Sequence, residues 1–396
     1  MKPASKTLLL IALIIAAINL RPGITSLAPL VERIAGELSL SRSLISLTTA
    51  LPVLCMGLLA PFAPRLALSI GLERTITLCL VLIAGALSLR LIGDSTAILI
   101  GSAAVLGAAI AIAGPLLSGF IKRHFVGHVG KVVAWYSLSM AVGGAAGAVL
   151  TAPATELLGD NWSRGLAVWA VLGFIGVLLW LFVPNLKASK ETAEQPAGLP
   201  WRKPRAWLIS SFFALQGGLF YAIATWTVAR YHEAGFSLLQ SNNLFGMIML
   251  MGLPSAFLLP WLAQRYNNRY VLLMVCGATT ALCLAMITFM PSLLPEVWAV
   301  ALGFALSGSF ALSLVLPLYE TDSPLDVSRW TAMMLFMGYS LGSLMPVITG
   351  FMRDYSGSYQ LPFAMMMSMA LLMTVLAGFL RHGVQQATPA EELRRV

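Results

Sequence analysis

An arginine stands inside an apolar run near the start of the chain. In the stretch IIAAINLRPGITSLAPL, residues 14–30, Arg21 is followed at once by Pro22 and Gly23. A guanidinium is a forked donor that binds anions through two parallel hydrogen bonds, which an ammonium does not reproduce. Pro22 removes one helix hydrogen bond and crowds the carbonyl of Ile18, so the helix should kink beside the charge. The residue types predict an anion-binding group next to a hinge formed by Pro22 and Gly23.

The depth of this charge predicts its surroundings. If the run crosses a membrane, Arg21 lies roughly 21 Å from one end of its helix and 15 Å from the other. An arginine at that depth costs about 2.5–3.5 kcal/mol and faces a helix bundle or a water-filled cavity. All 16 acidic residues fall in predicted loops, helix ends or tails, so the counter-charge is left to a substrate. The structural alternative is that the guanidinium bonds backbone carbonyls freed by Pro22.

Other polar side chains occur at comparable depth and are candidate substrate contacts. Asn19 lies two positions from Arg21, on nearly the opposite face of a helix, so one of the two is expected to serve packing. Gln216 and Tyr221 flank a Gly-Gly pair in a later apolar run. Tyr136 and Tyr339 open two similar stretches, YSLSMAVGGAAG and YSLGSLMP. Their rings and hydroxyls suit a planar heteroaromatic substrate, although packing tyrosines are about as common.

The sequence offers little for other chemistry. The four cysteines lie in apolar runs and have no spacing typical of disulfides or metal ligands. His124 and His128 are four residues apart beside basic residues, which favours a solvated basic loop over a ligand pair. No HExxH motif, phosphate loop or nucleophile beside a base is present. We therefore expect no metal, no cofactor and no enzymatic activity.

The composition places these residues in a membrane protein. Apolar residues make up 58% of the chain and charged residues 10%, and runs of about 20 apolar residues recur from end to end. Alternation typical of barrel strands is absent, so the runs predict helices. We expect twelve spans, at 7–30, 43–68, 75–92, 96–120, 131–153, 163–183, 207–229, 242–263, 270–290, 296–318, 329–351 and 360–381.

The distribution of basic residues predicts the orientation. Of the 25 lysines and arginines, 18 fall in segments on the side of the N-terminus. Apart from Arg21 in its span, the rest lie on the other side: Arg33, Arg42, Arg90, Arg164, Arg230 and Arg353. Because Lys and Arg are enriched in cytoplasmic loops, both termini should be cytoplasmic. The basic net charge therefore indicates topology, and we expect no binding to nucleic acid.

A long polar segment divides the chain into two sets of six spans. It runs over PNLKASKETAEQPAGLPWRKPR, residues 184–205. Similar stretches occur in the same order before and after it, which predicts two structural repeats. We expect a first six-helix bundle at 1–184, a cytoplasmic central loop at 185–206, a second bundle at 207–382 and a cytoplasmic tail at 383–396. We also expect the chain to act as a monomer.

Twelve spans in a 6+6 arrangement with a basic central loop resemble the major facilitator superfamily. More narrowly, NLRPGITSLAPLVERI, the GLER loop and the segment from GYSLG to RDYSGSYQLPF resemble its cyanate transporter family over essentially the whole chain. The resemblance implies an all-α membrane fold in which two six-helix halves rock about a central site. It also implies a gating loop after the second span, for which Arg65, Gly71 and Arg74 match the family pattern. Pro64 stands where the family has an aspartate, which puts that residue's usual salt bridge in doubt.

The function follows as an expectation. Without a nucleotide-binding motif, the chain should be a secondary active transporter of the bacterial inner membrane. The unpaired arginine predicts a small anionic or weakly acidic substrate. The family resemblance implies export of 2-nitroimidazole or a similar small heteroaromatic. Uptake or exchange of cyanate or another small anion is the alternative, and the composition does not separate the two.

Overall fold

The protein is all-helical in the part that its structure describes. The computed structural model describes residues 5–92, 95–125, 128–185, 199–321 and 324–392. Twelve helical segments within these residues are long and apolar enough to cross a membrane, which confirms the predicted number. Many apolar side chains on the outside of the helices are exposed, among them Leu181, Phe182 and Phe379. Such an apolar exterior suits lipid and not water.

The first half of the chain holds six spans, and several of them are interrupted. The first span contains α1 (Lys6–Asn19), α2 (Pro22–Thr25), η1 (Ala28–Leu30) and α3 (Val31–Glu37). The second contains α4 (Arg42–Ile45), α5 (Leu47–Leu59) and η2 (Ala60–Phe62), and is followed by α6 (Ala63–Ile70). The remaining four are α7 (Leu72–Leu89) with η3 (Arg90–Ile92), α8 (Thr96–His124), α9 (Val129–Leu157), and α10 (Trp162–Ala167) with α11 (Ala170–Leu181).

The second half begins earlier and ends later than the predicted spans. It contains α12 (Pro204–Glu233), α13 (Leu238–Tyr266), α14 (Arg269–Phe289), α15 (Pro295–Leu314) with α16 (Leu316–Glu320), α17 (Pro324–Gly342) with α18 (Leu344–Ser356), and α19 (Gln360–Glu392). Pro204 occupies the first turn of α12, where its missing N–H costs nothing. The helix α19 continues through most of the segment expected to be a tail. Most of the predicted central loop, 186–198, lies outside the described residues.

Related helices pack in the same way in the two halves. In the first half α9 lies against α1 and α2, and in the second half α17 lies against α12. Glycines make both approaches close. A methyl group at Gly143 would lie 2.3 Å from the carbonyl oxygen of Ile18, and one at Gly338 would lie 2.1 Å from the Phe213 ring. Tyr136 belongs to α9 and Tyr339 to α17, so each tyrosine comes from the helix that makes this close approach in its half.

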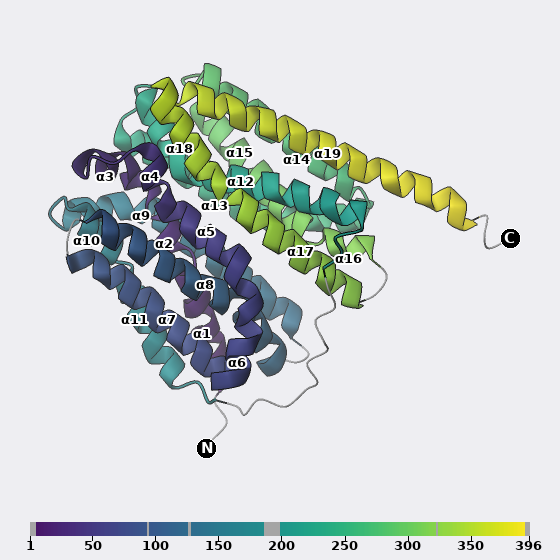
Figure 1. Ribbon diagram of the computed structural model, residues 1–396, viewed down its shortest axis with the longest axis horizontal. Helices are drawn as coiled ribbons and strands as arrows, with labels where there is room; N and C mark the ends of the chain where they lie inside the picture. The colour runs from purple at the N-terminus through teal and green to yellow at the C-terminus, as the bar shows by residue number, and fades with distance from the viewer. Residues whose placement is uncertain (1–4, 93–94, 126–127, 186–198, 322–323, 393–396) are drawn as a thin grey trace.

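The two halves pack against each other at one end of the molecule. We call the end at which α1 begins, α12 begins and α19 ends the terminus face, and the opposite end the distal face. Figure 1 shows α3, α4 and α18 gathered at the distal face. There, apolar residues of the first half such as Leu30 and Ile34 join the core cluster of the second half. At the terminus face, α6 contacts α7, α8 and η2 of its own half.

Candidate functional site

The break in the first span positions Arg21. The helix α1 ends at Asn19 and α2 begins at Pro22, so Arg21 is the residue that precedes the new helix. The predicted kink is therefore confirmed. Its physical cause is that Pro22 has no N–H to donate to Ile18. A side chain on Gly147 would lie 2.9 Å from the Cα of Pro22, so this glycine lets α9 pack directly on the break.

Aromatic side chains from both halves surround the guanidinium of Arg21. Its Cζ lies 5.9 Å from the centroid of the Phe220 ring, within the range of a cation–π contact. The phenol groups of Tyr136, Tyr221 and Tyr339 lie close enough to interact electrostatically with this guanidinium. Four of the six predicted substrate contacts thus gather at one place. Arg21 stands between α1 and α2, and the three tyrosines come from α9 in the first half and from α12 and α17 in the second.

The positive charge of Arg21 has no carboxylate partner among the described residues. None of the ion pairs in these residues includes it. Its carbonyl oxygen accepts from the backbone of Ile24 and Thr25, at 3.0 Å and 3.1 Å, while its guanidinium makes no hydrogen bond to a backbone carbonyl of the described residues. The side chain is partly exposed. Its donors are therefore available to an anion.

Asn19 and Gln216 lie in the protein interior and bond to neighbouring helices. The amide nitrogen of Asn19 donates to the carbonyl oxygens of Ile15 at 2.8 Å and of Leu172 in α11 at 3.1 Å. The amide nitrogen of Gln216 donates to the carbonyl of Leu306 in α15 at 3.0 Å, while its Oε1 is buried without a partner among the described residues. Asn19 is thus the member of the Asn19–Arg21 pair that serves helix packing in this conformation.

A buried carboxylate organises the terminus face of the first half. Glu73, in the first turn of α7, is 2% exposed. It lies 3.0 Å from Nε2 of His124 and 3.5 Å from Nη1 of Arg123. The prediction that His124 belongs to a solvated loop is wrong, because this residue ends α8 with its side chain buried against Glu73. His128 is exposed, as predicted.

Two of the predicted gating residues belong to this cluster and one does not. Gly71 has a φ of +96°, a conformation that favours glycine, and it lies against Asn185. With its amide turned to satisfy both neighbours, Asn185 donates to Glu73 at 3.0 Å and accepts from Nε of Arg74 at 2.7 Å. Arg65 is exposed and stacks on Phe62, with 5.7 Å from Cζ to the ring centroid. Glu73 is the only acid near the gating-loop pattern in the sequence, but it was not predicted as a site residue because the family pattern places its acid at the position of Pro64.

Hydrogen bonds across the distal face tie the two halves together. The carboxylate of Asp354 in α18 accepts from the backbone N–H groups of Arg42 and Ser43, each at 3.1 Å. It therefore caps the first turn of α4 from the other half. Glu32 accepts from the hydroxyl of Tyr359 and from Nη2 of Arg42, the latter at 2.8 Å. We call these five residues the distal latch.

The pKa of the Tyr359 phenol suits its role as a hydrogen-bond donor in the distal latch. Its side chain is buried, and burial together with the adjacent Glu32 carboxylate raises the pKa of the phenol well above its usual value. The hydroxyl therefore keeps its proton and can donate to Glu32 throughout the physiological range. The five latch residues were not singled out as a site from the sequence, because the partners that join the two halves are separated by more than three hundred positions.

The sequence and the fold have counterparts in known proteins. Residues 9–326 match the profile of the Major Facilitator Superfamily. This protein is a member of that superfamily. Within it, the chain is 30% identical to the cyanate transport protein CynX of Escherichia coli K12, over 90% of this chain and 92% of the relative. The chain belongs to the cyanate transporter family.

Two further relatives align over nearly the whole chain. The 2-nitroimidazole transporter of Escherichia coli K12 is 27% identical, with 94% of each chain covered. The uncharacterized transporter YycB of Bacillus subtilis strain 168 is 28% identical, with 92% of this chain and 91% of the relative covered. These relatives are transporters, and this major facilitator protein is a transporter rather than an enzyme.

Solved structures of superfamily members share the fold. The crystal structure of the nucleoside transporter NupG has a TM-score of 0.74 at 15% identity, with 94% of this chain and 98% of that chain covered. A bacterial homologue of the human lysosomal transporter Spinster has a TM-score of 0.71 at 17% identity, covering 95% and 97%. At these identities the likeness concerns the fold alone.

Proposed function

We propose that this major facilitator protein is a secondary active transporter of the bacterial inner membrane that exports 2-nitroimidazole or a similar small, weakly acidic heteroaromatic. The observation that carries the proposal is the environment of Arg21, a partly exposed cation without a carboxylate partner among the described residues and surrounded by aromatic rings. The guanidinium supplies a forked donor for an anionic or electron-rich group. The rings of Phe220, Tyr221 and the other tyrosines supply flat surfaces for a planar ligand.

The position of this cluster supports transport by alternating access. Arg21 and Tyr136 belong to the first half, and Phe220, Tyr221 and Tyr339 belong to the second. A ligand held by both groups couples its binding to the relative position of the halves. Pro22 and Gly23 serve as the hinge beside the ligand, while Arg65, Gly71 and Arg74 belong to the gating loop at the terminus face. Asn19 and Gln216 support the helices around the site in this conformation, because their amides donate to the carbonyls of Leu172 and Leu306.

The orientation of the chain decides which side of the membrane the distal latch closes. With both termini cytoplasmic, as the lysine and arginine distribution favours, the distal face is the outer side of the membrane. The latch then closes the outer side, and the structure corresponds to an inward-facing conformation. A substrate would reach Arg21 from the cytoplasm in this state, which is the entry route that export requires.

Transport of cyanate is the second candidate, favoured by the 30% identity with the cyanate transport protein. Cyanate is a small linear anion that the guanidinium alone could bind, without use of the rings. The two identities, 30% and 27%, do not separate the candidates. What separates them is whether the site recognises a ring.

A binding screen with matched ligands tests the proposal. The thermal unfolding temperature of the purified protein is measured with cyanate, 2-nitroimidazole and 1-methyl-2-nitroimidazole, at two pH values on either side of the ionisation of 2-nitroimidazole. We expect stabilisation by 2-nitroimidazole that grows as it ionises, and weak stabilisation by the methylated analogue, which cannot ionise. Stabilisation by cyanate alone would support the alternative. Counterflow of the stabilising ligand in liposomes then confirms transport.

The direction is tested separately. Inside-out and right-side-out membrane vesicles with the same imposed gradient are compared for ligand accumulation. Export predicts accumulation in inside-out vesicles. Accumulation confined to right-side-out vesicles would show uptake and would contradict the proposed direction.

A further inference from the structure

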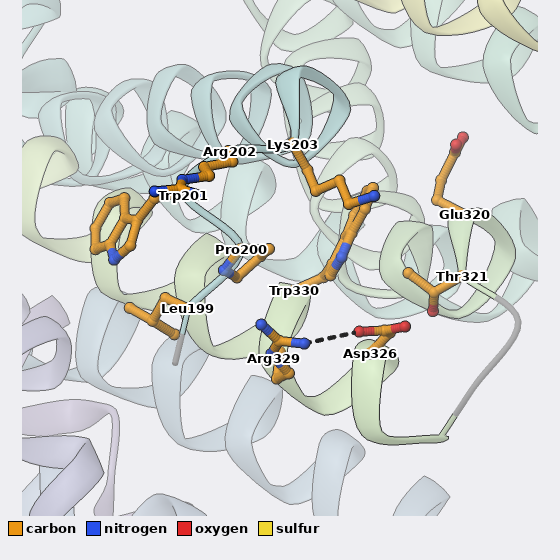
Figure 2. Close-up of a pocket in the computed structure, with 10 residues that line it drawn as sticks. All are labelled: Leu199, Pro200, Trp201, Arg202, Lys203, Glu320, Thr321, Asp326, Arg329 and Trp330. Carbon is orange, nitrogen blue, oxygen red and sulfur yellow. Dashed lines mark hydrogen bonds and ion pairs between the residues drawn. The ribbon is translucent and has the colours of Figure 1, made fainter. Parts of the chain in front are cut away.

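A cavity of about 480 Å³ opens at the terminus face of the second half, and Arg21 is not among the residues that line it. It lies between the segment 199–203, which leads into α12, and the region where α16 ends and α17 begins (Figure 2). Its volume falls in the range of about 300–1,000 Å³ typical of small-molecule sites. None of the residues assigned to the central transport site lines this cavity.

Basic residues outnumber acidic residues in the lining of the cavity. Arg202, Lys203 and Arg329 line it together with Glu320 and Asp326. The two carboxylates are already engaged by other groups. Asp326 pairs with Arg329 at 3.2 Å, as Figure 2 shows, and the carboxylate of Glu320 accepts hydrogen bonds from Arg205 and Tyr270.

Glu320 is bound by two residues that do not line the cavity. Its Oε1 accepts from Nη2 of Arg205 at 2.8 Å, its other oxygen accepts from Nε of the same residue, and the hydroxyl of Tyr270 also donates to it. A bidentate pair of this kind satisfies both carboxylate oxygens. Glu320 therefore has little capacity left to neutralise a cation within the cavity.

Arg202 and Lys203 remain without a carboxylate partner in the part of the chain that the structure describes. Both side chains are exposed, and Figure 2 shows that of Lys203 extending toward Trp330 across the cavity. The two residues also stand directly before the first turn of the 30-residue helix α12. Cations are unfavourable at the positive end of a helix dipole, so this arrangement gains stability when an anion binds there.

The level of the cavity in the membrane is marked by two tryptophans. The rings of Trp201 and Trp207 have their centroids 5.6 Å apart, and Nε1 of Trp207 donates to the carbonyl of Trp201 at 2.8 Å. Both are partly exposed, 46% and 39%. Exposed tryptophans of this kind lie at the headgroup level of a bilayer. The cavity therefore opens where lipid phosphates are concentrated.

We propose that this cavity binds the phosphate-bearing headgroup of an anionic membrane lipid, with Arg202 and Lys203 as the phosphate ligands. Basic pockets between membrane helices near the headgroup level bind lipids such as cardiolipin. The two phosphates of cardiolipin match a pair of adjacent cations. The bound lipid holds the start of α12 against α17, on the half that contributes Phe220 and Tyr339 to the central site.

Binding of cardiolipin to the full-length protein in detergent tests the proposal, measured by native mass spectrometry with phosphatidylethanolamine as the neutral lipid. Each Lys or Arg near an anionic headgroup strengthens binding roughly fivefold, so the variant Arg202→Gln/Lys203→Gln should bind cardiolipin about 30-fold more weakly. The variant Arg202→Lys/Lys203→Arg keeps both charges and should bind nearly as the wild type does. A loss of about 30-fold in this second variant too would show that the effect is on local folding and would overturn the proposal.

The matched control removes the same charge elsewhere on the same face. Lys6 and Arg265 are exposed and lie on the terminus face without an ion pair among the described residues, so Lys6→Gln/Arg265→Gln should retain cardiolipin binding. An equal loss in this control would reduce the proposal to a general surface charge effect and would overturn it. Competition with inorganic phosphate is the last test of the ligand. If millimolar phosphate binds this cavity and displaces cardiolipin completely, the site is one for a soluble anion and the lipid assignment is wrong.

Discussion

The guanidinium of Arg21 lies over the ring of Phe220, with 5.9 Å between Cζ and the ring centroid, and the two residues belong to different halves of the transporter. This contact places the arginine of the first span at the junction of the two halves, on which the proposed alternating access depends. Among the described residues this cation faces an aromatic ring and phenol groups and pairs with no carboxylate. In contrast, an arginine paired with a buried carboxylate would have to exchange that partner for each substrate.

Arg21→Lys tests the forked donor. The charge remains but the two parallel N–H groups do not, so the apparent affinity for the transported anion should fall roughly ten- to a hundredfold. Counterflow in liposomes measures it, with the yield of folded protein measured in parallel. Arg265→Lys, an exposed change on the terminus face, is the control and should transport normally. Near-normal affinity in Arg21→Lys would remove this residue from the site.

The three phenol groups around Arg21 give a second test. Tyr136→Phe, Tyr221→Phe and Tyr339→Phe each keep the ring and remove the hydroxyl, so each should weaken the apparent affinity roughly three- to tenfold while expression stays unchanged. Tyr266→Phe serves as the control, because Tyr266 is 63% exposed at the end of α13. If all three variants match the wild type in affinity, the hydroxyls serve packing and not recognition.

Asn19 should behave differently from the tyrosines. Its amide connects α1 to the carbonyl of Leu172 in α11, and one interhelical hydrogen bond in a membrane protein contributes on the order of 1 kcal/mol. Asn19→Ala should therefore lower the free energy of unfolding by about that amount and leave the apparent affinity nearly unchanged. Thermal unfolding and counterflow on the same preparation separate the two effects. A large loss of affinity with unchanged stability would return Asn19 to the substrate site.

The sequence predicts the helices better than their interruptions. Long apolar runs are set by the thickness of the bilayer, which makes their number readable from composition alone. The break at Pro22 was also predictable, because a proline removes a hydrogen bond wherever it stands inside a helix. The separation of α10 from α11 at Val168 and Trp169 has no such local signal, because no proline stands near it. There α10 packs against α9, η3 and α7, and the sequence does not reveal these contacts.

The cluster of tyrosines around Arg21 was predictable from residue type and repeat position. The hydrogen-bond partners of Asn19 and Gln216 were not. Arg21 stands out because a charge in a span is costly, and Tyr136 and Tyr339 stand out because they occupy matching positions in the two halves. Whether an amide such as Gln216 faces a ligand or a carbonyl depends on the rotation of its helix by a fraction of a turn. Sequence periodicity does not fix that rotation.

Asp354→Ala tests the distal latch. The change removes the cap of α4 by α18, and loss of such a cap costs about 1 kcal/mol. The population open at the distal face should rise roughly fivefold. Spin labels introduced at Gly36 and Tyr355, both exposed and on opposite halves, report the distance distribution. Asp326→Ala, a change at the terminus face, should leave the distal distances unaltered. An unchanged distribution in Asp354→Ala would show that the latch does not hold the halves together.

The stability and the distal distance of Tyr359→Phe, measured across pH, test the contribution of the latch hydroxyl separately from that of the latch carboxylates. Burial and the neighbouring Glu32 raise the pKa of Tyr359, so the folded closed state binds the phenolic proton more tightly than the unfolded chain does. The stabilisation from this group is fully present below the unfolded pKa of about 10 and is lost as pH rises beyond it. Tyr359→Phe should therefore lower the unfolding temperature and lengthen the Gly36–Tyr355 label distance equally at about pH 6 and about pH 9, both below that unfolded pKa. A difference from the wild type that vanishes at the higher pH would mean that the phenol ionises at its ordinary pKa or below, and would contradict a buried hydroxyl donating to Glu32.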